Sequence, residues 1–314
     1  MKKTAIILPA FNEESTIADA IKSFHEARPE AQIVVIDNAS TDRTGDIAIG
    51  TMRELKIIDH CVIFEPKKGK GNALRRAFHE IDAEIYVIVD ADLTYPAGRI
   101  NDLIEPLLAK QADMVVGDRY SGGFYQRVNN RPFHDFGNRL ISWLINFFFR
   151  ASLIDIMSGY RALTSSFVKS YPILVEGFEI ETDMTLHALD RRLRIIEIPV
   201  EYTDRPPGSK SKLNTFSDGA KVLFTIAKMV RYYKPLAFFV SACFLFSLLG
   251  VLAALPVFAD WFRERYIHHV PLAILSTGFE IVAVLSLAVG LILDAIRHQD
   301  KQTFERELLR KQLS

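Results

Sequence analysis

Two long, nearly uncharged runs close to the C-terminus constrain this chain more than any other feature. Leu236 to Phe258 carries no charged side chain over 23 residues, and Pro271 to Leu293 carries only Glu280. A helix of that length spans about 34 Å, which matches the hydrocarbon core of a bilayer. A buried helical hairpin is the alternative, but soluble domains rarely contain two such helices in succession. We therefore expect two transmembrane helices, at 236–258 and 271–293, in a lipid bilayer.

The charges around these runs predict the orientation of the chain. Seven Lys or Arg and one acidic residue lie between Arg205 and Lys234, whereas the loop from Ala259 to Val270 balances two arginines with two acidic residues. Because positive residues stay on the cytoplasmic side, we expect the N-terminal part and the tail at 294–314 to be cytoplasmic. Glu280 either pairs within the helix bundle or marks a functional site, and the sequence alone leaves both open.

Composition disfavours several other classes. The 314-residue chain has 38 basic and 38 acidic residues, whereas nucleic-acid binders usually carry a basic excess, so no nucleic-acid partner is expected. Cys61 and Cys243 are far apart and provide neither a disulfide framework nor a zinc spacing. The apolar run after the two N-terminal lysines is about six residues long, which is too short for a signal peptide.

Before the apolar runs, segments of strand length alternate with helical patterns. This alternation predicts an α/β fold with a mostly parallel sheet and helices on both faces. Such sheets bind ligands at the carboxyl ends of their strands. Neither GxGxxG nor GxxxxGK[ST] is present, which disfavours a dinucleotide-binding domain and a P-loop NTPase. The expected strands lie within 4–10, 31–38, 61–65, 84–92 and 112–119, and the expected helices within 14–27, 43–55, 70–81 and 98–110.

Polar residues follow three of the expected strands, and the clearest case is the segment YVIVDADLTYP at 86–96. Its two aspartates, Asp90 and Asp92, could accept hydrogen bonds from turn amides or cap the next helix. They could equally bind Mg²⁺ or Mn²⁺, because hard cations take oxygen ligands and are often held by one or two carboxylates plus substrate phosphates. So short a pattern does not decide between these interpretations.

Eight segments stand in this order along the chain: LPAFNEE, VIDNASTDRTGDIA, KGKGNALRRAF, VDADLTYP, VVGDRY, DIMSGYRAL, GFEIETDM and VEYTDRPPGSKSKLN. Taken together, they resemble family-2 glycosyltransferases of the GT-A fold. More narrowly, they are similar to the polyprenyl-phosphate branch, which includes dolichol-phosphate mannose synthases and bacterial undecaprenyl-phosphate glucosyltransferases. Two departures concern the base contacts and the metal: DNAS stands where many relatives have DDGS, and Thr94 stands where several have Gln.

The resemblance implies an inverting, metal-dependent enzyme at a prokaryotic plasma membrane. It would move one sugar from a nucleotide-diphosphate sugar, a UDP-hexose or UDP-N-acetylhexosamine, to a polyprenyl phosphate, with Mg²⁺ or Mn²⁺ as cofactor. The alternatives are a transferase acting on another lipid and a non-catalytic, membrane-anchored nucleotide-sugar binder. The hairpin could also join copies of the chain into a homo-oligomer. The implied parts are a catalytic domain at 1–215, a juxtamembrane amphipathic helix at 216–235, the hairpin at 236–293 and the tail at 294–314.

Matching positions give the expected site residues. Asp90 and Asp92 would hold the metal, with Asp92 the more direct ligand. Arg205 and Lys212, in a Pro/Gly/Ser-rich loop, would close over the diphosphate, and Arg119, with Arg131 or Arg139, would contact the lipid phosphate. Asp155 aligns with the catalytic base of relatives, although a phosphate monoester is largely ionised near neutral pH and Asp155 could only orient the acceptor. The donor would contact Pro9, Ala10, Asn12, Glu13, Asp37, Lys70, Asp90 and Ala91.

Plainer roles remain open for several of these residues. Asn12 and Glu13 could serve only a helix N-terminus, and Lys70 could be a solvated lysine in a loop. The basic loop around Lys212 could be attracted to anionic lipid. The aromatic segment Trp143 to Phe149 is too short to span a membrane and is either an interfacial helix or part of the core.

Overall fold

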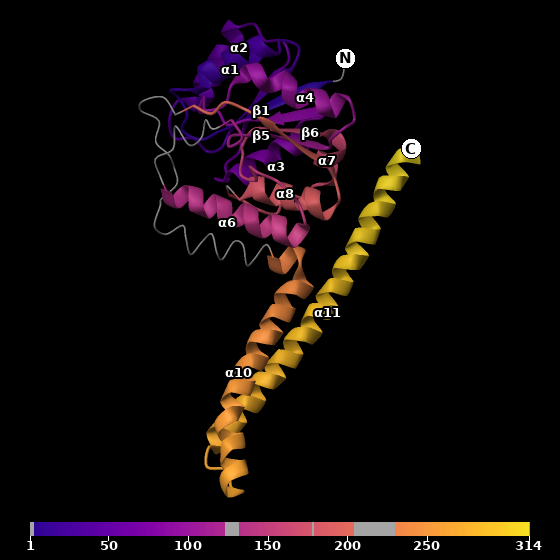
Figure 1. Cartoon of the computed structure of the whole chain (residues 1–314). Coiled ribbons are helices and arrows are strands. Elements are labelled where there is room, and N and C mark those ends of the chain that lie inside the picture. The colour runs from indigo at the N-terminus through magenta and orange to yellow at the C-terminus, as the bar shows by residue number, and fades with distance from the viewer. Residues whose placement is uncertain (1–2, 123–131, 178, 204–229, 314) are drawn as a thin grey trace. The chain divides into compact units, whose positions relative to one another are not determined.

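The computed structural model describes residues 3–122, 132–177, 179–203 and 230–313, with only the backbone described at 132–139, 308 and 310–313. The chain forms two units, residues 1–219 and 220–314. The first holds the sheet and the second holds two long helices (Figure 1).

The first unit is built on a seven-stranded, mostly parallel sheet, as the sequence predicts. Its strand order is β3-β2-β1-β4-β6-β5-β7. Strand β6 pairs antiparallel with both β4 and β5, and the remaining pairs are parallel. The strands are β1 (Thr4–Ala10), β2 (Gln32–Asp37), β3 (His60–Phe64), β4 (Ile85–Ile88), β5 (Met114–Asp118), β6 (Arg161–Thr164) and β7 (Ile195–Pro199).

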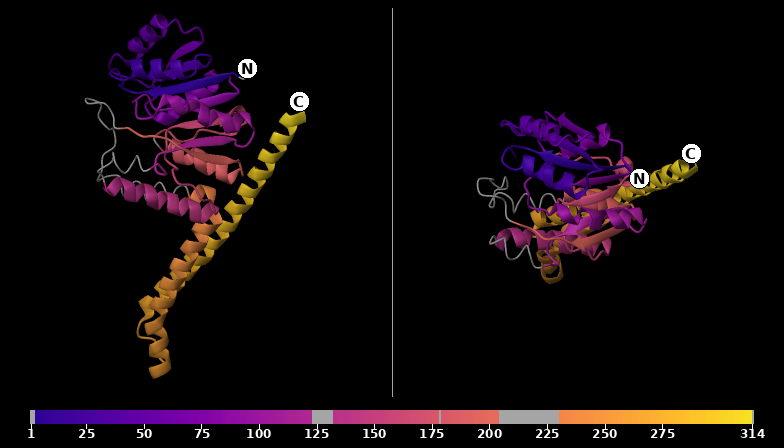
Figure 2. Two further views of the ribbon diagram at one scale, coloured as in Figure 1. Left: turned by 45° about the horizontal axis from the view of Figure 1, so that its top comes forward. Right: turned by 90° about the horizontal axis from the view of Figure 1, so that it is seen from above.

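Helices cover both faces of this sheet (Figure 2). Because side chains alternate along a strand, Ile6 and Leu8 of β1 enter one apolar core, while Ala5 and Ile7 enter the other. The buried residues of β1, β2 and β4 are almost all apolar, as expected for a sheet covered on two sides. The first core includes α1 (Ile17–Ala27), α2 (Thr44–Glu54) and α4 (Ile100–Leu108), and the second includes α3 (Lys70–Glu80), α7 (Ser165–Ser170) and α8 (Ile180–Asp190).

Helix α6 (Pro132–Phe149) is amphipathic along its described side chains. Ile141 and Ile145 are buried, whereas Trp143 and Phe147 are 60% and 66% exposed. The rings of Trp143 and Phe147 stack with their centroids 5.7 Å apart. One side of the helix therefore belongs to the core, and the other presents an aromatic pair of the kind found at membrane interfaces.

The second unit consists of α10 (Pro235–Glu264) and α11 (Val270–Leu313), which pack against each other. Both are long and apolar enough to cross a membrane. In the most apolar stretch of α10 only 6% of the residues are buried, and in that of α11 only 11%. A core helix of a soluble protein would be mostly buried, so these helices indicate membrane anchoring. Helix α11 extends to Leu313 and so includes almost all of the tail expected at 294–314. Of the juxtamembrane helix expected at 216–235, residues 216–229 lie outside the described part of the chain.

Glu280 contacts the partner helix of the hairpin. Its two carboxylate oxygens accept hydrogen bonds from the Ser247 hydroxyl at 3.1 and 3.3 Å. A Cβ on Gly250 would lie 2.6 Å from Glu280 Oε1, so the glycine makes room for the carboxylate. Ser276 donates to the Gly250 carbonyl at 2.8 Å. Of the two roles the sequence leaves open, these contacts favour pairing within the hairpin.

Candidate active site

The two aspartates that follow β4 differ in their surroundings. Asp92 is 3% exposed, and its Oδ1 accepts hydrogen bonds from the Thr94 hydroxyl at 2.6 Å and the Thr94 amide at 3.2 Å. The Asp90 side chain is 32% exposed. Thr94, the residue at one departure from the family pattern, thus fixes the Asp92 carboxylate directly.

Lys70, the first residue of α3, points into the protein rather than into solvent. Its Nζ lies 2.5 Å from Asp90 Oδ1 and 2.5 Å from Glu181 Oε1 of α8. Burial lowers the pKa of Lys70, but the two carboxylates raise it further, so the net pKa lies above its usual value. The interpretation of Lys70 as a solvated loop lysine is therefore wrong, and the lysine belongs to a buried ionic cluster with Asp90 and Glu181.

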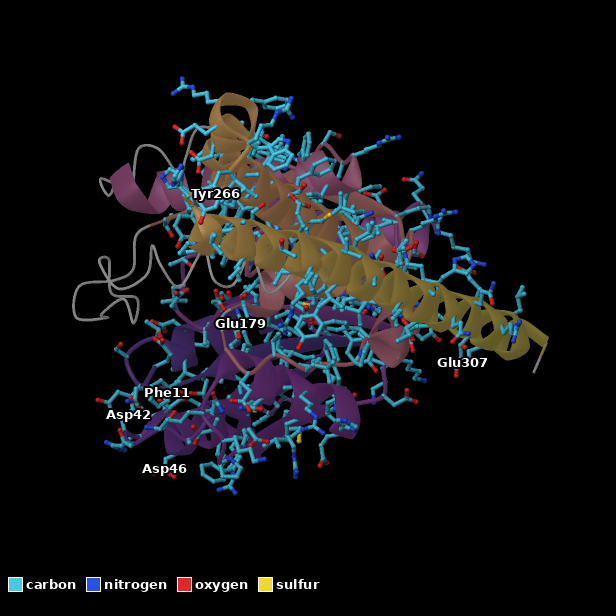
Figure 3. All side chains as sticks on the ribbon, turned by 90° about the horizontal axis from the view of Figure 1, so that it is seen from below. Phe11, Asp42, Asp46, Glu179, Tyr266 and Glu307 are labelled. Atoms are coloured by element: carbon cyan, nitrogen blue, oxygen red, sulfur yellow. The ribbon has the colours of Figure 1, made fainter. Side chains whose placement is uncertain are left out.

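The loops after β1 and β2 are tied together at the carboxyl edge of the sheet. Ala10 is paired with Asp37, and Asp37 Oδ1 accepts a hydrogen bond from the Ser40 amide at 3.1 Å. The Asn12 side chain accepts from the Thr41 amide at 2.7 Å. These contacts bring together the expected donor residues Pro9, Ala10, Asn12, Glu13 and Asp37, on the side of the unit where Figure 3 labels Phe11 and Asp42.

Glu13 and Asn38 have structural partners in the same region. Glu13 is buried, and its carboxylate accepts a hydrogen bond from the Thr16 hydroxyl at 3.2 Å at the start of α1. Asn38, which stands at the other departure from the family pattern, donates to the Lys67 carbonyl at 2.6 Å and accepts from the Gly69 amide at 2.7 Å. Asn38 thereby connects the end of β2 to the loop that carries Lys70.

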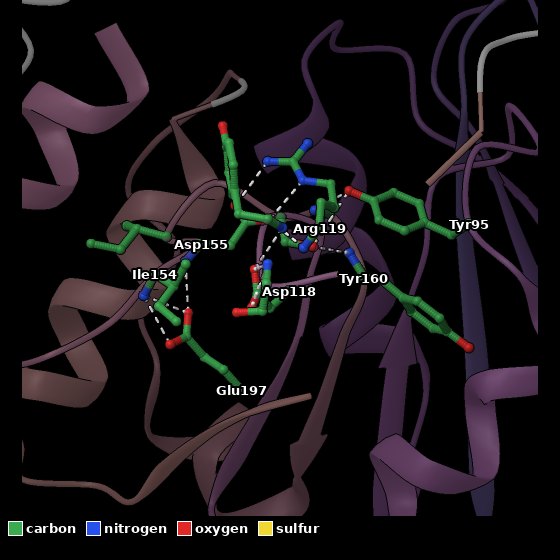
Figure 4. Close-up of polar contacts among 12 residues, drawn as sticks. Tyr95, Asp118, Arg119, Ile154, Asp155, Tyr160 and Glu197 are labelled. Carbon is green, nitrogen blue, oxygen red and sulfur yellow. Dashed lines mark hydrogen bonds and ion pairs between the residues drawn. The ribbon is translucent and has the colours of Figure 1, made fainter. Parts of the chain in front are cut away.

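Arg119 and Asp155 form a buried ion pair (Figure 4). Arg119 donates from Nε to Asp155 Oδ2 at 2.7 Å, from Nη2 to Oδ1 at 2.8 Å and from its amide to Oδ2 at 3.0 Å. The Arg119 guanidinium also lies over the ring of Tyr202, 5.4 Å from its centroid. Burial lowers the pKa of Arg119, but Tyr95 and Asp155 raise it further, so Arg119 remains a cation.

Glu197 and Tyr95 lie beside this pair. Glu197 of β7 accepts hydrogen bonds from the amides of Ile154 and Asp155, at 2.8 and 2.7 Å, and its burial raises its pKa. Tyr95 accepts a hydrogen bond at 2.9 Å from the amide of Gly159, which lies against Asp90 Oδ2. On its other side, the centroid of the Tyr95 ring is 5.4 Å from that of Tyr202, the ring over which the Arg119 guanidinium lies. Tyr95 therefore lies where the Asp90 cluster and the Arg119 pair meet.

Several expected site residues lie outside the described part of the chain. Arg131, Arg205 and Lys212 are among them, and only the backbone of Arg139 is described, within α6. Among the described residues, no group of three or more His, Cys, Asp or Glu side chains is arranged to hold a metal ion. A cation at Asp90 and Asp92 would take its remaining ligands from other oxygen atoms, such as those of substrate phosphates.

The sequence did not single out three residues of this region. Glu181 lies in GFEIETDM. The polar and apolar residues of α8 do not separate onto two faces of the helix, and an acidic residue in such a helix is a signal that could have identified Glu181. Arg161 is fully buried and donates to the carbonyls of Ile156 and Ser158, which shapes the loop between Asp155 and β6. Glu197 lies in the edge strand β7, and nothing local in the sequence distinguishes it from an ordinary surface carboxylate.

Comparisons with known proteins agree with this architecture. The mostly parallel seven-stranded sheet, with helices on both faces, has the fold of a GT-A domain. Its fold resembles the crystal structure of glucosyl-3-phosphoglycerate synthase from Mycobacterium tuberculosis in complex with Mn²⁺, UDP-glucose and phosphoglyceric acid. The TM-score is 0.55, at 23% identity over 73% of this chain and 79% of that one.

Sequence comparison identifies the family. Residues 5–168 match the model of glycosyl transferase family 2. The chain is 30% identical to glycosyltransferase AglJ of Haloferax volcanii over 96% of each protein. It is 28% identical to the undecaprenyl-phosphate mannosyltransferase of Micrococcus luteus, over 66% of this chain and 86% of that one. The chain belongs to glycosyltransferase family 2.

Proposed function

We propose that this protein transfers a single sugar, with inversion, from a nucleotide-diphosphate sugar to a polyprenyl phosphate at the cytoplasmic face of a membrane. The observation that carries the proposal is that Tyr95 lies between a carboxylate cluster suited to a donor and a buried arginine suited to an anionic acceptor. A UDP-hexose or UDP-N-acetylhexosamine is the proposed donor. The name of the Micrococcus luteus relative supports the class of acceptor.

On the donor side, Asp90 and Asp92 are proposed to hold Mg²⁺ or Mn²⁺. Their hard oxygen atoms suit these ions, and two carboxylates suffice when substrate phosphates complete the coordination. The relevant structural relative was crystallised with Mn²⁺ and UDP-glucose, which supports this assignment. When bound, the cation would neutralise charge on the leaving diphosphate. Asp92, held by Thr94, supplies a fixed carboxylate, and the loops that carry Asn12 and Asp37 are placed to bind the nucleoside.

On the acceptor side, a phosphate oxygen would form the new bond to the anomeric carbon as the bond to the donor diphosphate breaks, releasing a nucleoside diphosphate. The attacking phosphate is already ionised near neutral pH, so no base is required. Both oxygens of Asp155 bind Arg119, which favours an orienting role for Asp155 over proton removal. Arg131, Arg139, Arg205 and Lys212 are proposed as additional phosphate contacts.

The membrane anchor and the aromatic face of α6 fit a lipid substrate. Trp143 and Phe147 expose a stacked aromatic pair on the catalytic domain, and α10 and α11 supply apolar helices of spanning length. A soluble nucleotide sugar and a membrane-bound phosphate could then meet at one site.

A donor screen tests the proposal. Purified full-length protein in detergent is incubated with polyprenyl phosphate, Mn²⁺ and, separately, UDP-glucose, UDP-galactose, UDP-N-acetylglucosamine and GDP-mannose, and the lipids are examined by mass spectrometry. A polyprenyl phosphate that gains the mass of one sugar residue supports the proposal. Transfer to a glycerolipid in place of polyprenyl phosphate would replace the acceptor, and no glycosylated lipid with any donor would contradict the function.

A further inference from the structure

A buried lysine joins two carboxylates directly behind the proposed metal site. Lys70, Asp90 and Glu181 come from the start of α3, the end of β4 and the first turn of α8. The Lys70 and Glu181 side chains are 7% and 8% exposed, whereas that of Asp90 is 32% exposed. Asp90 is thus the member of this cluster that a ligand can reach, and the other two support it from inside.

Close backbone packing fixes the position of Glu181 relative to Lys70. The Gly71 amide donates to the Glu176 carbonyl at 2.9 Å. A Cβ on Gly69 or Gly71 would lie 2.1 Å from a carbonyl oxygen of residues 175–176, and Gly69 has a φ of +127°. The two glycines therefore let the start of α3 approach the segment that leads into α8.

The opposite side of Asp90 is also confined. A Cβ on Gly159 would lie 2.4 Å from Asp90 Oδ2, and the Gly159 amide is held by the Tyr95 hydroxyl. Lys70 binds Oδ1 of the same carboxylate. Asp90 is therefore bound by Lys70 at Oδ1 and lies against Gly159 at Oδ2, and its position depends on whether Lys70 stays in place.

The charge of the cluster depends on Glu181. One lysine and two carboxylates leave a net charge of −1, whereas Lys70 and Asp90 alone would be neutral. A divalent cation approaching Asp90 is attracted by the first arrangement and far less by the second. Two carboxylates also share the attraction of the lysine, which leaves Asp90 a better ligand than in an exclusive ion pair.

We propose that Glu181 is a positioning residue for the donor site: it holds Lys70 between two carboxylates, which fixes Asp90 and leaves it enough negative charge to bind a divalent cation together with a nucleoside diphosphate. This inference rests on the proposed function, because it requires Asp90 at the metal. It adds Glu181 of α8, more than 80 positions from Asp90 and Asp92, to the residues that determine metal affinity.

The test measures Mn²⁺ binding, not turnover. Full-length protein in detergent is titrated with Mn²⁺ in the presence of UDP or GDP, and free Mn²⁺ is read by electron paramagnetic resonance. Glu181→Gln should weaken Mn²⁺ binding by about tenfold or more, because an adjacent charge is lost. The double variant Lys70→Met/Glu181→Gln again leaves a net charge of −1 but lacks the lysine that fixes Asp90, so it should recover only part of the affinity. The control is Glu176→Gln, the same exchange at an exposed position just before α8, and this variant should bind Mn²⁺ as tightly as the unmodified protein.

Each outcome separates this inference from the proposed function. Unchanged Mn²⁺ affinity in Glu181→Gln, while the unmodified protein binds Mn²⁺ and nucleotide, would overturn the inference alone. Equal weakness in the single and double variants would show that the negative charge supplied by Glu181 does not contribute to the Mn²⁺ affinity, which also overturns the inference. If the unmodified protein bound no Mn²⁺ with either nucleotide, the metal part of the proposed function would fail as well.

Discussion

Replacing Asp155 with asparagine should destabilise the protein strongly, whatever its role in catalysis. Arg119 donates three hydrogen bonds to Asp155, and the two side chains are only 10% and 1% exposed. Removing one member of a buried ion pair leaves the other charge uncompensated and typically costs about 3–5 kcal/mol. At about 2–4 °C per kcal/mol for a domain of this size, we expect the unfolding midpoint to fall by roughly 6–20 °C.

The assay is thermal unfolding of full-length protein in detergent at one fixed scan rate, with the double variant Arg119→Met/Asp155→Leu beside the single one. Because apolar side chains can replace a buried pair at little cost, the double variant should unfold well above Asp155→Asn. A midpoint for Asp155→Asn within about 2 °C of the unmodified protein would refute the reasoning. Loss of activity in that variant would then reflect the chemistry of Asp155 itself.

Four further substitutions have defined expected outcomes. Asp92→Asn should nearly abolish transfer at limiting Mn²⁺ while leaving the circular dichroism spectrum unchanged. Gly159→Ala should lower activity by displacing Asp90, whereas Gly98→Ala, where a Cβ meets no atom within 4 Å, should not. Lys212→Ala should lower kcat/KM for the donor by roughly ten- to a hundredfold, and an effect on the lipid alone would reassign it. In the hairpin, Glu280→Gln should retain the hydrogen bond from Ser247 and leave the unfolding midpoint unchanged, whereas Glu280→Leu should lower the free energy of unfolding by about 1 kcal/mol.

The central strands were predictable because their apolar runs are continuous. Strands β1, β2, β4 and β5 lie within the segments expected from the sequence, and β3 begins one residue before its expected segment, at His60. Strand β6, the four residues Arg161–Thr164, was not predicted, because so short a strand carries little pattern and its antiparallel place between β4 and β5 depends on tertiary pairing. Strand β7 at the sheet edge was missed for a related reason, since its residues are only half-buried and alternate weakly.

The candidate site was predictable only where its residues are local in sequence. Asp90 and Asp92 stand out because two carboxylates end an apolar strand. Lys70 and Arg119 were expected to face ligands, but the structure pairs them with Glu181 and Asp155, 111 and 36 positions away. Single residues carry no sign of such distant partners, because a buried ion pair is specified by the fold and not by the neighbouring sequence.

The most direct test of the central claim is the stoichiometry of nucleotide release. Full-length protein is supplied with the donor found by the screen and with Mn²⁺, and both nucleoside diphosphate and glycosylated lipid are measured as polyprenyl phosphate is added. We predict one nucleoside diphosphate per glycosylated polyprenyl phosphate, and almost no product with Asp92→Asn. Nucleotide release that is independent of polyprenyl phosphate, or equal product with Asp92→Asn, would contradict the proposed transfer at this site.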